Sequence, residues 1–255
     1  MKVVIVGSGN VGTVLGKLIH KANHEIVQVL SRNENNAKKL ASNFNCDWGT
    51  LESSPHKDAD IYLLAITDTS LYHLDQHLQL YTKTVVHTAG SVSKDVLKNI
   101  SNNYGIIYPL QSLAKNADEV PEIPLLIDGS SDDTILLLHN FATSLSANVS
   151  VVNDAERLKY HVAAVLVSNF TNHLFAMADE FCKTENIDFK QLFPLINETV
   201  NRVQKHSPKS VQTGPAIRED IYTLGKHLQI LSAHPDLKYL YLKLSESILK
   251  LHQKK

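Results

Sequence analysis

The feature that most constrains the fold is a glycine-rich turn near the N-terminus, between an apolar run and a helix-like segment. The run Val3–Val6 leads into Gly7-Ser8-Gly9-Asn10-Val11-Gly12, a match to GxGxxG, and Thr13–Leu18 continues with helical character. In such a turn the first glycine permits a tight bend, the second lets a pyrophosphate approach the backbone, and the third lets the helix pack on the sheet. We predict that these six residues bind the phosphates of a dinucleotide at the helix N-terminus. The alternative is a strand–helix turn without a ligand.

Short apolar runs alternate with helical patterns over the first half of the chain. This order predicts a Rossmann-type, doubly wound α/β domain, with a mostly parallel sheet and helices on both faces. The runs are rich in β-branched residues, as strands buried on both faces should be. The predicted strands are Val3–Val6, Glu25–Leu30, Asp60–Ile66, Thr84–His87, Gly105–Tyr108, Pro124–Asp128 and Asn148–Val152. The predicted helices are 10–22, 34–43, 68–79, 93–100 and 131–146.

The second half of the chain has only helical patterns. We therefore predict a nucleotide-binding domain over residues 1–153 and an all-helical domain over residues 154–255. A cleft between two domains is a common place for a ligand. The expected helix starts in this half are Asp154, Asp188, Gly214-Pro215 and Pro235-Asp236.

The second predicted strand ends in Ser31 and Arg32, where a dinucleotide site usually has an Asp or Glu that binds a ribose hydroxyl. A carboxylate would repel a 2′-phosphate. Ser31 and Arg32 instead offer a hydroxyl and a planar cation, which pairs with phosphate and stacks on adenine. We therefore predict NADP(H) as the cofactor rather than NAD(H). A solvated loop arginine is the alternative.

The ends of two further predicted strands extend the cofactor site towards the nicotinamide. The residues assigned there are Ala65, Ile66, Thr67, His87 and Gly90. Asp68, which follows, is equally suited to cap the next helix. For His87 a buried, hydrogen-bonded strand histidine is the alternative.

Polar residues recur on the first helix of the second half. His161, Ser168 and Asn172 share one stripe with Val165, which indicates a polar patch that faces a cleft. The alternative is a set of groups bonded within the core or across a dimer contact. Arg218 lies in the first turn of the helix predicted at Gly214, where the helix dipole disfavours a cation, so we expect it to meet an anion or Asp220.

Bulk composition excludes several classes of function. Lys plus Arg (25) nearly balances Asp plus Glu (26) with no polybasic tract, so neither nucleic acid nor an acidic membrane is an expected partner. No apolar run reaches the length of a membrane span, and the two cysteines suit a reducing compartment, so we expect a cytoplasmic protein. His73 and His77 have a metal-ligand spacing, but no third ligand is near, so no metal site is predicted.

Longer motifs resemble those of one family. They are the glycine loop, Ser31-Arg32-Asn33, YPLQSL from Tyr108, YHVAAVLVSN from Tyr160 and TGPAIRED from Thr213. Together they are similar to the Rossmann-like NADP oxidoreductases with a C-terminal domain of unknown function 2520. That family is grouped with 6-phosphogluconate dehydrogenase, pyrroline-5-carboxylate reductase and prephenate dehydrogenase. The resemblance implies an NADP-binding domain, a helical domain like that of 6-phosphogluconate dehydrogenase, and a homodimer through the helices.

The resemblance also implies residues that face the cleft. These are Gln111, Ser112, His161, Asn169, Thr213 and Arg218, with Tyr108, Ser168 and Asn172 beside them. Two positions depart from the family pattern. Tyr108 replaces a histidine that is usual there, and Val165 stands where hydroxyacid-dehydrogenase relatives have a lysine. The lysine acid–base chemistry of those relatives therefore cannot be transferred.

Two functions compete on this basis. The first is an NADP-dependent oxidoreductase that transfers a hydride to or from a small carbonyl or imine metabolite, with His161 as proton donor. The second is a non-catalytic NADP(H)-binding sensor or assembly protein, which the two departures favour. A deazaflavin cofactor in the same fold ranks below NADP(H).

Overall fold

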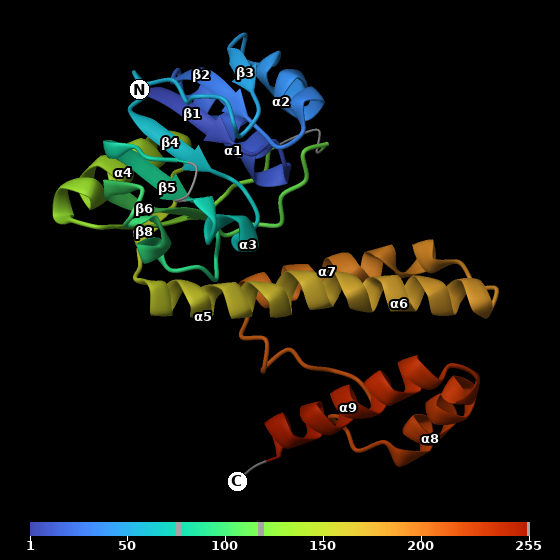
Figure 1. Cartoon of the computed structure of the whole chain (residues 1–255). Helices are drawn as coiled ribbons and strands as arrows, with labels where there is room; N and C mark the ends of the chain where they lie inside the picture. The colour runs from blue at the N-terminus through green and yellow to red at the C-terminus, as the bar shows by residue number, and fades with distance from the viewer. Residues whose placement is uncertain (75–77, 117–119, 254–255) are drawn as a thin grey trace. The chain divides into compact units, whose positions relative to one another are not determined.

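The structure is a computed structural model that describes residues 1–74, 78–116 and 120–253. It divides into two compact units, Met1–Ser168 and Asn169–Lys255 (Figure 1). The whole sheet belongs to the first unit. This unit also includes α5 (Asp154–Ala164), so it extends beyond residue 153, where the sequence places the domain boundary.

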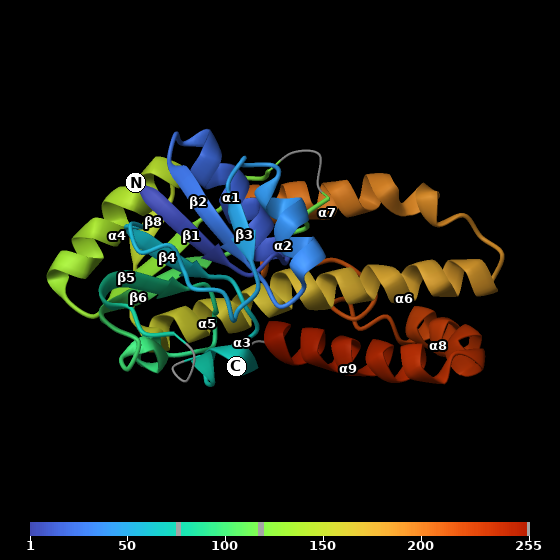
Figure 2. The ribbon, with the colours of Figure 1, turned by 45° about the horizontal axis from the view of Figure 1, so that its top comes forward.

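The first unit is built on an eight-stranded sheet in the order β3-β2-β1-β4-β5-β6-β7-β8. All neighbouring pairs are parallel except β6–β7, and the order reverses between β1 and β4, as in a doubly wound fold. Figure 2 shows β1, β2 and β4 side by side. The strands are β1 (Lys2–Val6), β2 (Glu25–Leu30), β3 (Asp47–Gly49), β4 (Ile61–Leu64), β5 (Tyr81–His87), β6 (Ser101–Pro109), β7 (Leu125–Gly129) and β8 (Val149–Val151). The predicted fold class is confirmed.

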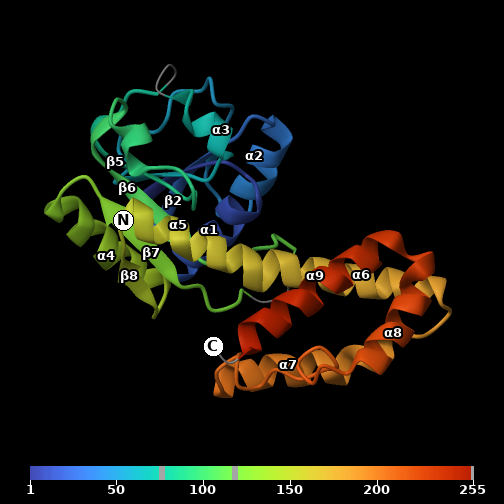
Figure 3. The ribbon, with the colours of Figure 1, turned by 90° about the horizontal axis from the view of Figure 1, so that it is seen from below.

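Alternate residues of each strand pack on opposite faces of the sheet. Val3 and Ile5 of β1 face the cluster that contains α1 (Asn10–Lys21), α2 (Glu34–Ala41) and α4 (Asp132–Leu145). Val4 and Val6 face a second cluster, formed by residues of the segments that follow β4 and β5. In the views, α2 lies beside β3 (Figure 1) and α4 lies beside β7 and β8 (Figure 3).

Several predicted elements differ from those observed. β3 was not predicted, because Asp47–Gly49 is short and carries no apolar alternation. The described part of segment 68–79 forms an α-helix only at α3 (Asp68–Leu71), and His77 lies outside the described residues. Segment 93–100 contains only the 3₁₀-helix η2 (Lys94–Leu97). Buried apolar residues recur three or four positions apart in both segments, which explains the wrong predictions: Leu71, Leu74 and Leu78 in the first, and Leu97 and Ile100 in the second.

The second unit contains helices only. They are α6 (Thr171–Thr184), the 3₁₀-helix η4 (Phe189–Leu192), α7 (Phe193–Lys205), α8 (Ile221–Ile230), the 3₁₀-helix η5 (Leu231–Ala233) and α9 (Pro235–His252). Between α5 and α6 the backbone forms a π-helix, η3 (Val165–Phe170). No helix among the described residues is both long and apolar enough to cross a membrane.

One helix cap and one helix start differ from the prediction, although α5 does begin at Asp154. Asn153 rather than Asp154 caps α5, because its side chain and that of Glu156 form a reciprocal capping box. α8 begins at Ile221 with Asp220 as cap, and not at Gly214, because residues 215–219 form turns with Glu219 at a positive φ of 53°. Asp188 caps η4 as predicted.

The glycine turn is packed too tightly for side chains at two positions. Gly7 has a φ of 115°, and a Cβ there would lie 2.1 Å from the Ala65 carbonyl oxygen. A Cβ on Gly12 would lie 2.2 Å from the Gly7 carbonyl oxygen. Gly9 differs, since a Cβ there would meet nothing within 4 Å. The first and third glycines thus serve packing, and the second leaves open space.

We expect Gly12→Ala to lower the free energy of unfolding by roughly 1–3 kcal/mol, because the added Cβ overpacks the turn. Gly9→Ala is the matched control. Its φ of −79° suits alanine and its surroundings are open, so its stability should stay near that of the unaltered chain. Urea unfolding followed by circular dichroism measures both. Equal stability of the two variants would contradict the packing described.

Candidate functional site

A cavity of about 440 Å³ lies at the carboxyl ends of β1, β2 and β4. Such an edge, where the strand order reverses, is where open α/β sheets bind ligands. The cavity brings together most of the predicted cofactor residues. Its lining comprises Gly7, Ser8, Gly9, Asn10, Val11, Ser31, Arg32, Asn33, Asn36, Leu51, Ala65, Ile66, Thr67, Thr88 and Lys115.

The N-terminus of α1 faces this cavity without a side-chain cap. Gly9 is the N-cap and has no side chain to bond, and the first turn contains no acidic residue. The N–H groups of this first turn have no partner within the helix, and the helix dipole favours an anion there. The open space at Gly9 lets a phosphate approach them, so the residues present fit a pyrophosphate.

The Ser31–Arg32 segment is fixed beside the glycine turn. Ser31 is buried, and its Oγ lies 2.7 Å from Ser8 Oγ, so the two loops share a hydrogen bond. Arg32 is exposed at the cavity wall. Asn33 caps α2 by accepting a hydrogen bond from the Asn36 backbone N–H. The end of β2 therefore presents a hydroxyl, a guanidinium and two amide side chains.

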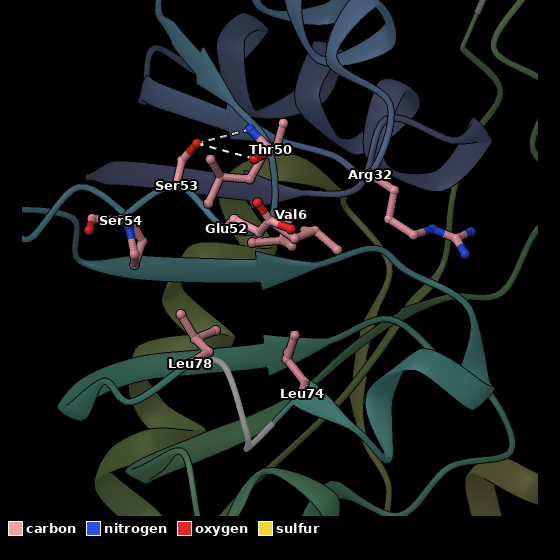
Figure 4. A pocket seen from close by; sticks show the side chains of 11 residues that line it. Val6, Arg32, Thr50, Glu52, Ser53, Ser54, Leu74 and Leu78 are labelled. Carbon is pink, nitrogen blue, oxygen red and sulfur yellow. Dashed lines mark hydrogen bonds between the residues drawn. The ribbon is translucent and has the colours of Figure 1, made fainter.

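A second cavity of about 680 Å³ adjoins the first, since Arg32 and Leu51 line both (Figure 4). Its lining is apolar at Val6, Leu30, Leu74 and Leu78 and polar at Thr50, Glu52, Ser53 and Ser54. Figure 4 shows the Arg32 side chain extending away from Ser53. An apolar floor beside an exposed guanidinium suits a flat aromatic base.

The charges of the first cavity have one sign. Arg32 and Lys115 line it, and none of the described residues that line it is acidic. Lys115, Asn36 and Thr88 were not predicted, because none of them falls within the glycine motif or at the end of the second strand. Asn33 belongs to the motif Ser31-Arg32-Asn33, but it was not assigned to the cofactor. Lys115 arrives from the connection between β6 and β7.

His87 does not belong to the cofactor surface. It is fully buried, its Nδ1 accepts the Ala89 backbone N–H at 3.1 Å, and its Nε2 lies 3.3 Å from the Ser93 carbonyl oxygen. Burial lowers the pKa of this imidazole to about 4. His87 is thus a neutral, fully bonded core group, which is the alternative interpretation of its sequence position.

Asp68 has a different role from the predicted cap. Thr67 is the N-cap of α3, and Asp68 is its first helical residue. Asp68 accepts a hydrogen bond from Ser91 Oγ at 2.5 Å, which links the ends of β4 and β5.

Tyr108 of β6 and His161 of α5 form a hydrogen-bonded pair beside Gly90, which follows β5. Tyr108 Oη lies 2.9 Å from His161 Nδ1, and the rings meet edge to face at 5.9 Å. Gly90 packs against both, since a Cβ there would lie 2.7 Å from His161 Nδ1. Burial raises the pKa of the Tyr108 hydroxyl, against the opposing charge of Arg157, so this hydroxyl keeps its proton at neutral pH.

A buried arginine holds the Gly90 loop against α5. Arg157 is 1% exposed and donates to the carbonyl oxygens of Gly90 and Val92 and to Asp154 Oδ1. Burial alone would raise the pKa of Asp154, but hydrogen bonds from Ser93 and Arg157 outweigh it and hold that pKa below its usual value. The charged network fixes Gly90 where it contacts the Tyr108–His161 pair.

The remaining predicted cleft residues are distributed as follows. Gln111 Nε2 donates to the Glu122 carbonyl oxygen, and Gln111 Oε1 accepts a hydrogen bond from the Ser112 backbone N–H. Neither Gln111 nor Ser112 lines the first cavity. Ser168 lies in the π-helix, whose wider turn alters the stripe expected from α-helical spacing. Asn169, Asn172, Thr213 and Arg218 lie in the second unit. Arg218 stands in a turn before α8, so the helix-dipole argument no longer applies to it.

Metal ligands do not gather in the described parts of the chain. No group of three or more His, Cys, Asp or Glu residues there has a suitable arrangement.

Comparison with known proteins agrees with these features. A family model described as "NADP oxidoreductase coenzyme F420-dependent" matches residues 2–90, and one described as "Domain of unknown function (DUF2520)" matches residues 123–248. The crystal structure of "putative NADP oxidoreductase BF3122" from Bacteroides fragilis is 36% identical, covers 98% of each chain and has a TM-score of 0.91. The chain belongs to this family of NADP oxidoreductases. The predicted family and its NADP(H) cofactor are confirmed at this level.

More distant structures share the fold. A 1-pyrroline-5-carboxylate reductase from Streptococcus pyogenes is 13% identical over 98% of each chain, with a TM-score of 0.64. A reductive aminase from Aspergillus terreus, in complex with NADPH and ethyl-5-oxohexanoate, is 13% identical over 98% of this chain and 93% of that chain, with a TM-score of 0.67. No curated protein matches the sequence.

Proposed function

We propose that this member of the family reduces a carbonyl or imine group of a small metabolite with NADPH. The observation that carries the proposal is a cavity lined by an uncapped helix N-terminus and by Ser31, in which the charged residues of the described lining are two cations, Arg32 and Lys115. That combination suits a dinucleotide with a 2′-phosphate. The fold shared with a reductive aminase that binds NADPH and a keto ester supports the carbonyl or imine class.

The residues present would hold four parts of the cofactor. The pyrophosphate would lie at Gly9 and the first turn of α1, and the 2′-phosphate at Ser31 and Arg32. The adenine would enter the second cavity, where Leu30 and Leu74 form an apolar wall. The nicotinamide would then lie towards Thr67 and Thr88, at the ends of β4 and β5.

NADPH when bound supplies the hydride, and the protein must supply the proton that goes to the carbonyl oxygen or imine nitrogen. His161 is the proposed donor, since histidine exchanges protons readily near neutral pH. Its Nδ1 is held by Tyr108, which leaves Nε2 for the substrate. Gln111, Ser112, Ser168, Asn169, Asn172, Thr213 and Arg218 stay predicted substrate residues.

Arg32→Ala should raise the Kd for NADPH about 10- to 100-fold, because a charge-assisted contact to the 2′-phosphate is lost. The Kd for NADH should change little, since NADH lacks that phosphate. Fluorescence titration of the reduced cofactors measures both. Lys39→Ala is the matched control, because Lys39 is exposed on the same helix as Asn36 but does not line the cavity. Equal losses for NADPH and NADH would contradict the assignment.

The proton donor is tested on a substrate found by a metabolite screen followed at the nicotinamide absorbance. His161→Ala should lower kcat roughly 100- to 10,000-fold, the usual contribution of a general acid. Tyr108→Phe keeps the ring packing and removes only the hydrogen bond, so its loss should be smaller. NADPH affinity is the control and should be unaffected in both. Unchanged turnover of His161→Ala would rule out this donor.

A sensor or assembly role is the second candidate. Tyr108 at the position of a family histidine and Val165 at that of a lysine favour it. In that case NADPH binds but no carbonyl or imine in the screen is turned over. The screen should include a deazaflavin as hydride partner, because the N-terminal family model names coenzyme F420.

A cytoplasmic location is also proposed, because Cys46 and Cys182 are both free thiols. Cell fractionation tests this location.

We further propose a homodimer through the helical unit. Of its described residues only Cys182, Ala216 and Leu231 are buried, too few for a core of its own. Large apolar side chains are exposed on α6, α7, α8 and α9, among them Leu195, Ile221, Tyr222 and Tyr239. A second copy that presents the same helices would cover them, as in obligate homodimers.

Light scattering should therefore give close to twice the 28.4 kDa of one chain. A double variant, Leu195→Glu with Ile221→Glu, should shift the mass towards one chain, because it buries charge in the interface. Leu136→Glu is the control, since Leu136 is 60% exposed on α4 of the first unit. A monomeric unaltered chain would overturn the proposal.

A further inference from the structure

The first cavity holds a cation that the dinucleotide motif does not supply. Lys115 belongs to the connection between β6 and β7, far along the chain from the glycine turn, yet it lines the cavity with Gly9 and Asn10. Among the described residues of the lining, Arg32 is the other charged one. Arg32 stands at the end of β2, and Lys115 stands beside the start of α1, so the two cations serve different parts of the cavity.

The backbone of Lys115 is tied to α1 at two points. Its N–H donates to Asn10 Oδ1 at 3.3 Å, and its carbonyl oxygen accepts from Lys17 Nζ at 3.4 Å. Leu113, two residues earlier, packs against the core cluster that contains α1. These contacts use backbone atoms of Lys115. Within the described residues its ammonium group has no hydrogen bond or ion pair to a protein group.

We propose that Lys115 binds the pyrophosphate of NADP(H). Asn10 is the first residue of α1, where the uncapped N–H groups already attract an anion. An ammonium group anchored beside them adds a full charge to the partial charge of the helix terminus. No acidic residue of the described lining competes for it. This role rests on the proposed cofactor site and gives the two cations separate tasks.

Because Lys115 and Arg32 would bind different phosphates of the cofactor, their substitution should weaken the binding of different ligands. Lys115→Met should raise the Kd for NADP⁺ and for NAD⁺ by the same factor, about 5- to 10-fold, because both contain the pyrophosphate. It should leave the Kd for 2′-AMP unchanged, since this fragment lacks the 5′-phosphates. Arg32→Ala should do the reverse: NADP⁺ and 2′-AMP lose affinity and NAD⁺ does not.

Isothermal titration of the full-length chain with these three ligands tests the proposal. Lys115→Arg should keep most of the affinity, because the charge is retained. Lys21→Met is the matched control, an exposed lysine at the far end of the same helix. Thermal unfolding should be unchanged in Lys115→Met, because the side chain is exposed and its structural bonds are made by the backbone.

The outcomes separate this role from the cofactor assignment. If the unaltered chain binds NADP⁺, and Lys115→Met binds NADP⁺ and NAD⁺ with unchanged Kd, the role of Lys115 is overturned. The assignment of NADP(H) as the cofactor is then retained. A loss for NADP⁺ and 2′-AMP alone would move Lys115 to the 2′-phosphate and also overturn the proposal. If the unaltered chain binds none of the three ligands, the cofactor site itself fails, and the role fails with it.

Discussion

At the turn between β1 and α1, backbone meets backbone without room for a side chain. The carbonyl oxygen of Ala65 occupies the place of a Cβ on Gly7, and that of Gly7 occupies the place of a Cβ on Gly12. This contact sets where α1 begins relative to the ends of β1 and β4. The N–H groups of its first turn are thereby aimed into the cavity, and Ser31 and Ala65 come within reach of the same ligand. The rest of the site depends on that geometry.

The site built on this turn attracts anions by several independent means. A helix terminus without a cap, a buried serine, a guanidinium and an ammonium group come from three segments of the chain. None of them is neutralised by an acid in the described lining. Uncompensated positive charge costs stability in a folded protein, and a bound polyanion removes that cost. This is the physical sense in which the cavity is adapted to a phosphorylated dinucleotide.

The region around Tyr108 is organised by different forces. A buried arginine ties the loop after β5 to α5, and the loop in turn supports the Tyr108–His161 pair. The Tyr108 hydroxyl keeps its proton at neutral pH, because burial raises its pKa, and it is hydrogen-bonded to His161.

The sequence by itself determined the α/β domain, its first turn and the preference for a 2′-phosphate. These follow from local constraints, because each is carried by residues that are close together in the sequence. The features are the GxGxxG turn, the β-branched runs and the Ser31-Arg32 pair at the end of β2. The assignment of His87 to the cofactor, the cap at Asp154 and the helix start at Gly214 were wrong, because burial and capping partners decided them. Lys115, Thr88 and the pairing of Tyr108 with His161 were decided by the tertiary structure alone. They depend on which strand ends meet at one edge of the sheet. The spacing of residues along the chain does not predict which residues become neighbours there.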